Sequence, residues 1–142
     1  MMPPDRSPLE LIIYVDGSVE GNPGPGGIGV VIEASDGAPV AAWGEAIGHA
    51  TNNQAEYEAL LAGLRKARQL GARAVAVRSD SQLLVRQFLG EYRVKDAKLR
   101  PLHEEALRLA RQFQRFAIEH IPRERNRAAD QLANRARLGK PS

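Results

Sequence analysis

The sequence contains no cysteine, and this absence removes several classes of function. Disulfide frameworks, thiolate nucleophiles and cysteine-ligated zinc are excluded. The first residues lack the apolar segment of a signal peptide, and no hydrophobic run approaches the length of a membrane span. We therefore expect a soluble, cytoplasmic protein with no membrane partner.

The length and composition suit one domain with a proper core. The chain has 142 residues, 43% of them hydrophobic, and is too short for two comfortable domains. Residues 1–8 contain three prolines and little that could pack. We expect a mobile N-terminal tail over residues 1–8, followed by a single domain over residues 9–142.

Charge is divided unevenly between the two halves of the chain. Residues 1–70 contain four Lys/Arg and nine Asp/Glu, whereas residues 71–142 contain sixteen and eight. The second half is a candidate surface for binding a polyanion. The alternative is that its arginines only solvate amphipathic helices.

The order of the expected elements predicts an α/β fold. Strands over residues 9–16, 28–33 and 40–48, linked by short turns, form an antiparallel meander. A capping box of Thr51 and Gln54 begins a helix that ends near Gly71, and the next strand, over 75–77, runs parallel to a neighbour. Helices over 83–88, 99–113 and 128–136 and a strand over 116–121 follow. We expect a five-stranded mixed sheet, three strands antiparallel and two parallel, flanked by helices.

Four acidic residues occupy positions where burial is expected. Asp16 and Asp80 each end an apolar strand, Glu56 lies in the first turns of the first long helix, and Asp130 lies early in the last helix. If the two strands are parallel neighbours, their acids emerge at the edge where open α/β sheets bind ligands. Taken singly, each acid has an ordinary explanation as well, because aspartate after a strand bonds its own backbone and acids in a first helical turn complement the helix dipole.

Four converging carboxylates repel one another, and a bound cation would explain their joint presence. Oxygen ligands without cysteine or a histidine cluster favour Mg²⁺ or Mn²⁺ over zinc. Two such ions about 4 Å apart would clamp the attacking and departing oxygens of a phosphodiester displacement. The acids therefore predict metal-dependent phosphodiester chemistry.

Four motifs in a fixed order carry a resemblance to a known family. They are Asp16-Gly-Ser-x-x-Gly-Asn-Pro-Gly-x-Gly-Gly, Thr51-Asn-Asn-x-Ala-Glu56-Tyr, Ser79-Asp80-Ser-Gln and Asn126-x-x-x-Asp130-x-Leu-Ala. Over roughly residues 9–138 the chain closely resembles ribonuclease H type 1. The resemblance implies an RNase H-like fold and an endonuclease that cuts the RNA strand of an RNA–DNA hybrid, leaving a 3′-hydroxyl and a 5′-phosphate. It further implies two Mg²⁺ or Mn²⁺ ions on the four acids, with Asp16 as the bridge.

The resemblance also assigns residues to the substrate. Thr51 and Asn22 look like anchors for a DNA phosphate, and Asn53 and Gln82 occupy positions that touch the hybrid backbone or base edges. The backbone of the glycine loop would approach the RNA strand closely, which is a reason for side chains to be absent there. The full set is Gly17, Ser18, Asn22, Thr51, Asn53, Gln82 and Asn126.

The histidine and the arginines before the last acid depart from the family pattern. Well-known members carry a histidine in a mobile loop that assists proton transfer or product release. His120 lies ten residues before Asp130, which suits this role, but it also alternates with Phe116 and Ile118 on a strand and could pack there. Arg123 or Arg125 could stabilise charge instead.

The chain leaves little room for the basic, tryptophan-rich handle of some relatives. We expect a reduced grip from the basic residues of the segment after the third acid, with weak and salt-sensitive binding by a monomer. These residues are Arg93, Lys95, Lys98 and Arg100.

Two alternatives to the hybrid-specific nuclease follow from the same fold. One is a catalytically silent hybrid-binding domain, which would be expected to have lost at least one acid, whereas all four are present. The other is a related nuclease that also cuts double-stranded RNA, and the motifs leave this open.

Overall fold

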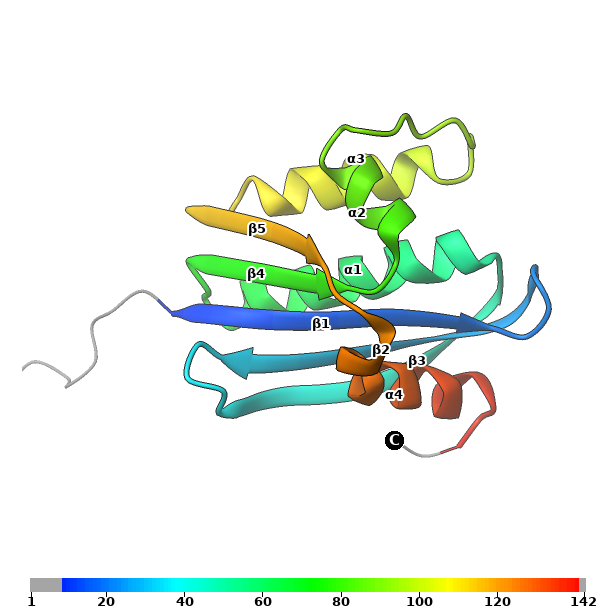
Figure 1. Cartoon of the computed structure of the whole chain (residues 1–142), viewed down its shortest axis with the longest axis horizontal. Coiled ribbons are helices and arrows are strands. Elements are labelled where there is room, and N and C mark those ends of the chain that lie inside the picture. Colours follow the sequence, from blue (N-terminus) through cyan, green and yellow to red (C-terminus); the bar gives the residue numbers. More distant parts are fainter. Residues whose placement is uncertain (1–8, 141–142) are drawn as a thin grey trace, which may run out of the picture.

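Five strands form one mixed sheet in the computed structural model, which describes residues 9–140 (Figure 1). The first three strands are antiparallel neighbours, and the last two run parallel to the first. The predicted five-stranded mixed sheet is confirmed. The strands are β1 (Glu10–Val19), β2 (Gly24–Ala34), β3 (Pro39–Ala50), β4 (Ala74–Ser79) and β5 (Arg115–His120), in the spatial order β3-β2-β1-β4-β5.

The two faces of the sheet carry different helices. The helices are α1 (Asn52–Gln69), α2 (Gln82–Phe88), α3 (Arg100–Ala110) and α4 (Arg127–Arg137), with a short 3₁₀ turn η1 (Arg123–Arg125) before the last. Gly63 of α1 faces Ile13 and Val30, whereas Gly29 on β2 faces Ala129 of α4. Successive strand residues point to opposite faces, so α1 and α4 cover opposite sides of the sheet.

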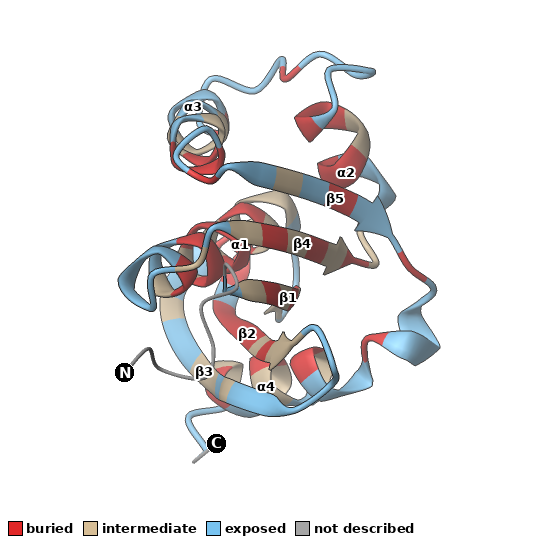
Figure 2. Cartoon of the chain, turned by 90° about the vertical axis from the view of Figure 1, so that its left-hand side faces the viewer, coloured by how far each residue is buried: buried red, intermediate tan, exposed pale blue. Residues whose placement is uncertain are grey.

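The face under α1 holds the large apolar side chains. Leu11, Ile13 and Val15 alternate along β1 and are buried together with Leu60 and Leu64 of α1. Figure 2 shows the buried residues concentrated between the sheet and its helices, while the connection between α2 and α3 is almost wholly exposed. This packing fixes the position of β1, the central strand.

The face under α4 is built from glycine and alanine. A Cβ atom on Gly29 would lie 2.0 Å from the carbonyl oxygen of Ala129, and one on Gly27 would lie 2.4 Å from that of Ala133. The backbone of α4 therefore rests directly on the sheet, and a side chain at these positions would push it away.

The glycine-rich stretch differs from its expected form as a loop beside the RNA. Residues 24–27, which were expected in the loop, belong to β2, and only residues 20–23 connect β1 to β2. The close approach of α4 is the physical reason for Gly27 and Gly29 in β2. The predicted end of the first strand at Asp16 was wrong as well, because β1 continues to Val19.

Asp16 nevertheless lies where one of the neighbours of β1 stops. Pairing with β4 ends at Val15 and Ser79, whereas pairing with β2 continues to Val19. Beyond Val15 the β4 side of β1 is open for side chains.

The tail expected over residues 1–8 lies outside the described residues. Within the described range, none of the helices combines the length and apolar character that crossing a membrane requires.

Candidate active site

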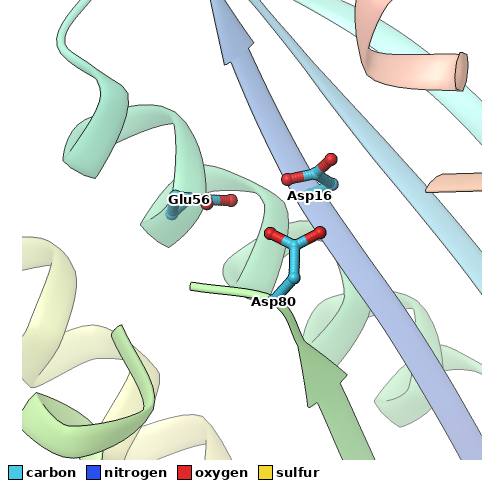
Figure 3. A group of neighbouring side chains, drawn as sticks. All are labelled: Asp16, Glu56 and Asp80. Atoms are coloured by element: carbon cyan, nitrogen blue, oxygen red, sulfur yellow. The ribbon is translucent and has the colours of Figure 1, made fainter. Parts of the chain in front are cut away.

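Asp16 is buried within β1, beside the first turns of α1 (Figure 3). Its side chain is 4% exposed, and its Oδ1 accepts a hydrogen bond of 2.9 Å from the amide of Gly17. Asp16 pairs with Gly29 of β2. A carboxylate removed from water in this way needs a partner that offsets its lost hydration.

Glu56 reaches the same place from the start of α1. The helix begins at the predicted capping box, in which Thr51 Oγ1 accepts from the amide of Gln54 at 3.1 Å and Gln54 Oε1 accepts from the amide of Thr51 at 2.8 Å. Glu56 Oε1 accepts a hydrogen bond of 2.7 Å from the amide of Gly17. The same amide therefore contacts both Asp16 and Glu56.

Gly17 permits this approach because it has no side chain. A Cβ atom there would lie 2.6 Å from the backbone carbon of Ala55 and 2.8 Å from the nitrogen of Glu56. The backbones of β1 and α1 thus meet at this residue. The sequence assigned Gly17 to the RNA strand and missed its role as a donor to two carboxylates; its position directly after an acid was the available signal.

Asp80 follows β4 and is held by a residue that comes 46 positions later. Its Oδ2 accepts a hydrogen bond of 3.1 Å from Nδ2 of Asn126. Ser81, the next residue, caps α2 by accepting from the amide of Leu84 at 3.2 Å. The turn between strand and helix therefore fixes the backbone on both sides of Asp80.

Three of the four predicted acids converge. One carboxylate oxygen from each of Asp16, Glu56 and Asp80 lies within 4.8 Å of the others, and Figure 3 shows the three groups turned toward one space from a strand, a helix and a strand end. Asp130, in the first turn of α4, is not part of this group. It is close enough to Asp16 to raise the pKa of that carboxyl further.

The convergence disfavours the charged forms. Burial raises the pKa of Asp16 well above the ordinary carboxyl range, and the nearby Glu56 and Asp80 raise it further. Burial and the charge of Asp80 likewise raise the pKa of Glu56, while the Gly17 amide and Arg123 oppose the rise. A divalent cation would offset this repulsion, and a donor set of carboxylate oxygens fits Mg²⁺ or Mn²⁺.

His120 and Arg123 lie along the chain that leads to α4. His120 is the last residue of β5, pairs with Ser79 and is exposed, so the packing role that we considered for it is wrong. Arg123 begins η1 and lies near enough for its charge to act on Glu56. It also lines a hollow of about 390 Å³ together with Glu124, Arg127, Asp130 and Gln131.

The expected hybrid-contacting residues differ in how free their side chains are. Asn22 Oδ1 accepts a hydrogen bond of 2.9 Å from the amide of Asn52, which ties the β1–β2 connection to the start of α1 beside Thr51. Asn53 is half-buried, and Gln82, the first residue of α2, is exposed. Asn126 is only 1% exposed, so its burial contradicts the expected direct contact with substrate.

Ser18 is engaged by α4. Its hydroxyl donates to Oδ1 of Asn134 and accepts a hydrogen bond of 3.0 Å from Nε of Arg137. Arg137 also reaches Glu20 at 3.4 Å. Our sequence analysis missed Asn134 and Arg137; their spacing of three residues, which places them on one face of a helix, was the available signal.

The basic segment after α2 has neither helix nor strand over residues 89–99. Arg93, Lys95 and Lys98 are exposed there. Arg100 behaves differently, because its guanidinium donates to the backbone oxygens of Val94 and Lys95, both at 3.3 Å. Arg100 therefore shapes the segment, whereas the other three present free charge.

Comparison with known proteins agrees with this geometry. A family model described as reverse transcriptase-like matches residues 14–136. The crystal structure of RNase H1 from Halobacterium salinarum NRC-1 superimposes with a TM-score of 0.88 at 43% identity, covering 89% of this chain and 96% of that one. The chain belongs to the reverse transcriptase-like family and, within it, to ribonuclease H type 1.

Two further relatives of this ribonuclease H type 1 chain are informative. LC11-RNase H1, isolated from compost, was solved in complex with an RNA/DNA hybrid and is 40% identical, with a TM-score of 0.86 over 91% of this chain and 97% of that one. A bifunctional protein of Mycobacterium tuberculosis (strain ATCC 25618 / H37Rv) is 47% identical over 90% of this chain. The chain spans 35% of that relative's length and 66% of the Halobacterium ribonuclease HI sequence.

Proposed function

We propose that this chain is a divalent-metal-dependent endoribonuclease that hydrolyses the RNA strand of RNA–DNA hybrids. The observation that carries the proposal is the convergence of three carboxylates within 4.8 Å. It is supported by 40% identity to a protein that was solved with an RNA/DNA hybrid.

The four acids would hold two Mg²⁺ or Mn²⁺ ions, with Asp16 shared between them. The raised pKa values of Asp16 and Glu56 support this, because crowded carboxylates stay ionised at neutral pH when a cation offsets their repulsion. When bound, such ions activate water and neutralise charge on the departing oxygen, and the expected products are a 3′-hydroxyl and a 5′-phosphate.

The chain's own groups orient the carboxylates and stabilise charge. The Gly17 amide directs one oxygen each of Asp16 and Glu56, which leaves the remaining oxygens of these groups for other ligands. Arg123, whose charge reaches Glu56, would stabilise negative charge on the cleaved phosphate. His120, exposed at the end of β5, would carry a proton to or from the products.

The hybrid would contact residues beside the start of α1 and residues of the basic segment over 89–99. Asn22 and Thr51 would bind the DNA backbone beside the start of α1, and Asn53 and Gln82 would touch the substrate nearby. The basic segment would add salt-dependent affinity for the hybrid, because the side chains of Arg93, Lys95 and Lys98 are exposed. A monomer acting in the cytoplasm is part of this proposal.

The decisive experiment is incubation of an end-labelled RNA–DNA hybrid with the protein, with and without Mg²⁺ or Mn²⁺. Duplex DNA and duplex RNA are the parallel substrates. Metal-dependent cleavage of only the RNA strand of the hybrid is expected. Binding of the hybrid without cleavage would favour the silent binding domain, and equal cleavage of duplex RNA would favour the broader nuclease.

A further inference from the structure

Asn126 connects two of the elements that carry the acids. It lies between η1 and α4 with its side chain 1% exposed. Its Nδ2 donates twice, to the backbone oxygen of Val15 at 2.9 Å and to Oδ2 of Asp80 at 3.1 Å. Since Val15 immediately precedes Asp16, one amide group joins the strand of Asp16 to the carboxylate of Asp80.

The orientation of this amide is determined by its neighbours. A carbonyl oxygen and a carboxylate oxygen can only accept, so the NH₂ side of Asn126 must face them. Its Oδ1 is then buried without a hydrogen-bond partner among the described residues. A buried acceptor without a partner costs stability, and an apolar side chain would avoid that cost. Stability alone therefore does not account for an amide here.

The backbone of Asn126 extends the connection to the fourth acid. Its carbonyl oxygen accepts a hydrogen bond of 3.1 Å from the amide of Asp130. This bond closes the first turn of α4, the turn that carries Asp130. Asn126 thus contacts the elements that carry Asp16, Asp80 and Asp130. Its donor group is a neutral amide. A lysine or arginine in the same place would offset the negative charge that a cation needs.

We propose that Asn126 is a positioning residue that sets Asp80 relative to Asp16 and Asp130 before a cation binds. The inference rests on the metal site of the proposed function. It differs from a substrate contact, because the side chain is buried and both donor hydrogens are used within the protein. Residues that orient metal ligands through hydrogen bonds in this way affect metal affinity strongly.

The test is the substitution Asn126→Asp, which keeps the shape and replaces the donor with a carboxylate facing Val15 and Asp80. The readout is the rise of Tm with Mn²⁺ in the absence of substrate. The Mn²⁺ concentration at half of the full rise should increase about 10- to 100-fold. Asn134→Ala is the matched control, because this residue lies on α4, the helix that follows Asn126, and bonds Ser18 instead of an acid; it should leave the Mn²⁺ dependence unchanged.

A metal-free measurement keeps the inference falsifiable. Asp80→Asn should restore part of the stability lost in Asn126→Asp, because it removes the like-charge contact, and should not stabilise the chain to the same extent in the wild-type background. Equal effects in both backgrounds would overturn the inference. If Asn126→Asp does not fold, Asn126→Ala with the same Mn²⁺ titration decides, because it also removes both hydrogen bonds.

The remaining outcomes separate the inference from the proposed function. A wild-type Mn²⁺ dependence in the variants, together with a raised KM for the hybrid, would identify Asn126 as a substrate contact and overturn the inference. A wild-type chain that binds Mn²⁺ but leaves the hybrid intact would overturn the proposed function and leave this test valid. No Tm response to Mn²⁺ in the wild type would overturn both.

Discussion

The acid-lined edge of the sheet and the basic segment over residues 89–99 are built in opposite ways. Each acid of the edge comes from or directly follows a regular element, and amide donors fix oxygens on three of them. The basic segment has no regular structure, and its basic side chains are exposed. Arg100, which directly follows the segment, is also exposed but donates to the backbone oxygens of Val94 and Lys95.

The difference follows from the range over which each region acts. Carboxylates that share a space of a few ångströms repel strongly and act on one point, so small displacements change what they can bind. Positive charges that attract a phosphate backbone act through water over about 10 Å, so their exact placement matters less. Changes to the edge should therefore affect chemistry and stability, and changes to the segment should affect binding.

The largest expected effect is the loss of cleavage in Asp16→Asn. The substitution keeps the volume of the side chain and removes the charge that the proposed ions need. Initial rates on a saturating hybrid with Mg²⁺ should fall by more than about 10³-fold. Asp36→Asn, in the turn between β2 and β3, is the control and should retain the wild-type rate. Cleavage that survives in Asp16→Asn would refute the metal assignment.

Gly17→Ala should disrupt the arrangement of the acids by displacing α1. The new Cβ would meet the backbone of Ala55 and Glu56, which cannot rotate away as a side chain could. We expect a loss of about 3 kcal/mol in the free energy of unfolding and a strong fall in kcat, measured by denaturant titration and by hybrid cleavage. In the control Gly26→Ala the new atom would lie 3.1 Å from the side chain of Ile47 and 3.3 Å from the carbonyl oxygen of Gly48, and shifts of a few tenths of an ångström relieve both contacts, so a loss below about 1 kcal/mol is expected. Equal losses would contradict this account.

The pH dependence of stability without metal should reveal the crowded carboxylates. Asp16 and Glu56 have pKa values raised above those of the unfolded chain, so their contribution is fully present below about pH 4 and is lost as pH rises through the raised values. The Tm of the metal-free protein should therefore fall between pH 5 and pH 9 by several degrees. Asp16→Asn should flatten the fall, and Mg²⁺ should reverse it. A Tm that is equally pH-dependent in Asp16→Asn would contradict the assigned cause.

The sequence was sufficient to predict the features whose determining contacts are local or periodic. Alternating Leu11, Ile13 and Val15 predicted the central strand, and the Thr51 capping box located the start of α1. The motifs supplied the four acids, of which three lie together and the fourth lies beside Asp16. These features depend on neighbours in sequence or on a pattern that repeats every two to four residues.

The errors come from contacts between distant parts of the chain. Gly27 was assigned to a loop because glycine carries no pattern, whereas its reason is the backbone of Ala133, 106 residues later. Asn126 was assigned to the substrate, yet it is buried against Val15, 111 residues earlier. A motif names the residue types at a site, but which partners they meet is decided by tertiary packing.

The smallest expected effect belongs to the basic segment, and it should change binding alone. Replacing Arg93, Lys95 and Lys98 by glutamine, with Arg100 kept to preserve the loop, should raise KM for the hybrid roughly five- to tenfold at low salt. The dependence of KM on salt should become shallower and kcat should stay within about twofold, because no carboxylate moves. The charge-matched control replaces three exposed arginines, which are Arg68 in the last turn of α1, Arg73 directly before β4 and Arg111 directly after α3. Arg73 thus lies at the end of β4 opposite to Asp80. If both triple variants change KM equally, net charge rather than the segment attracts the hybrid.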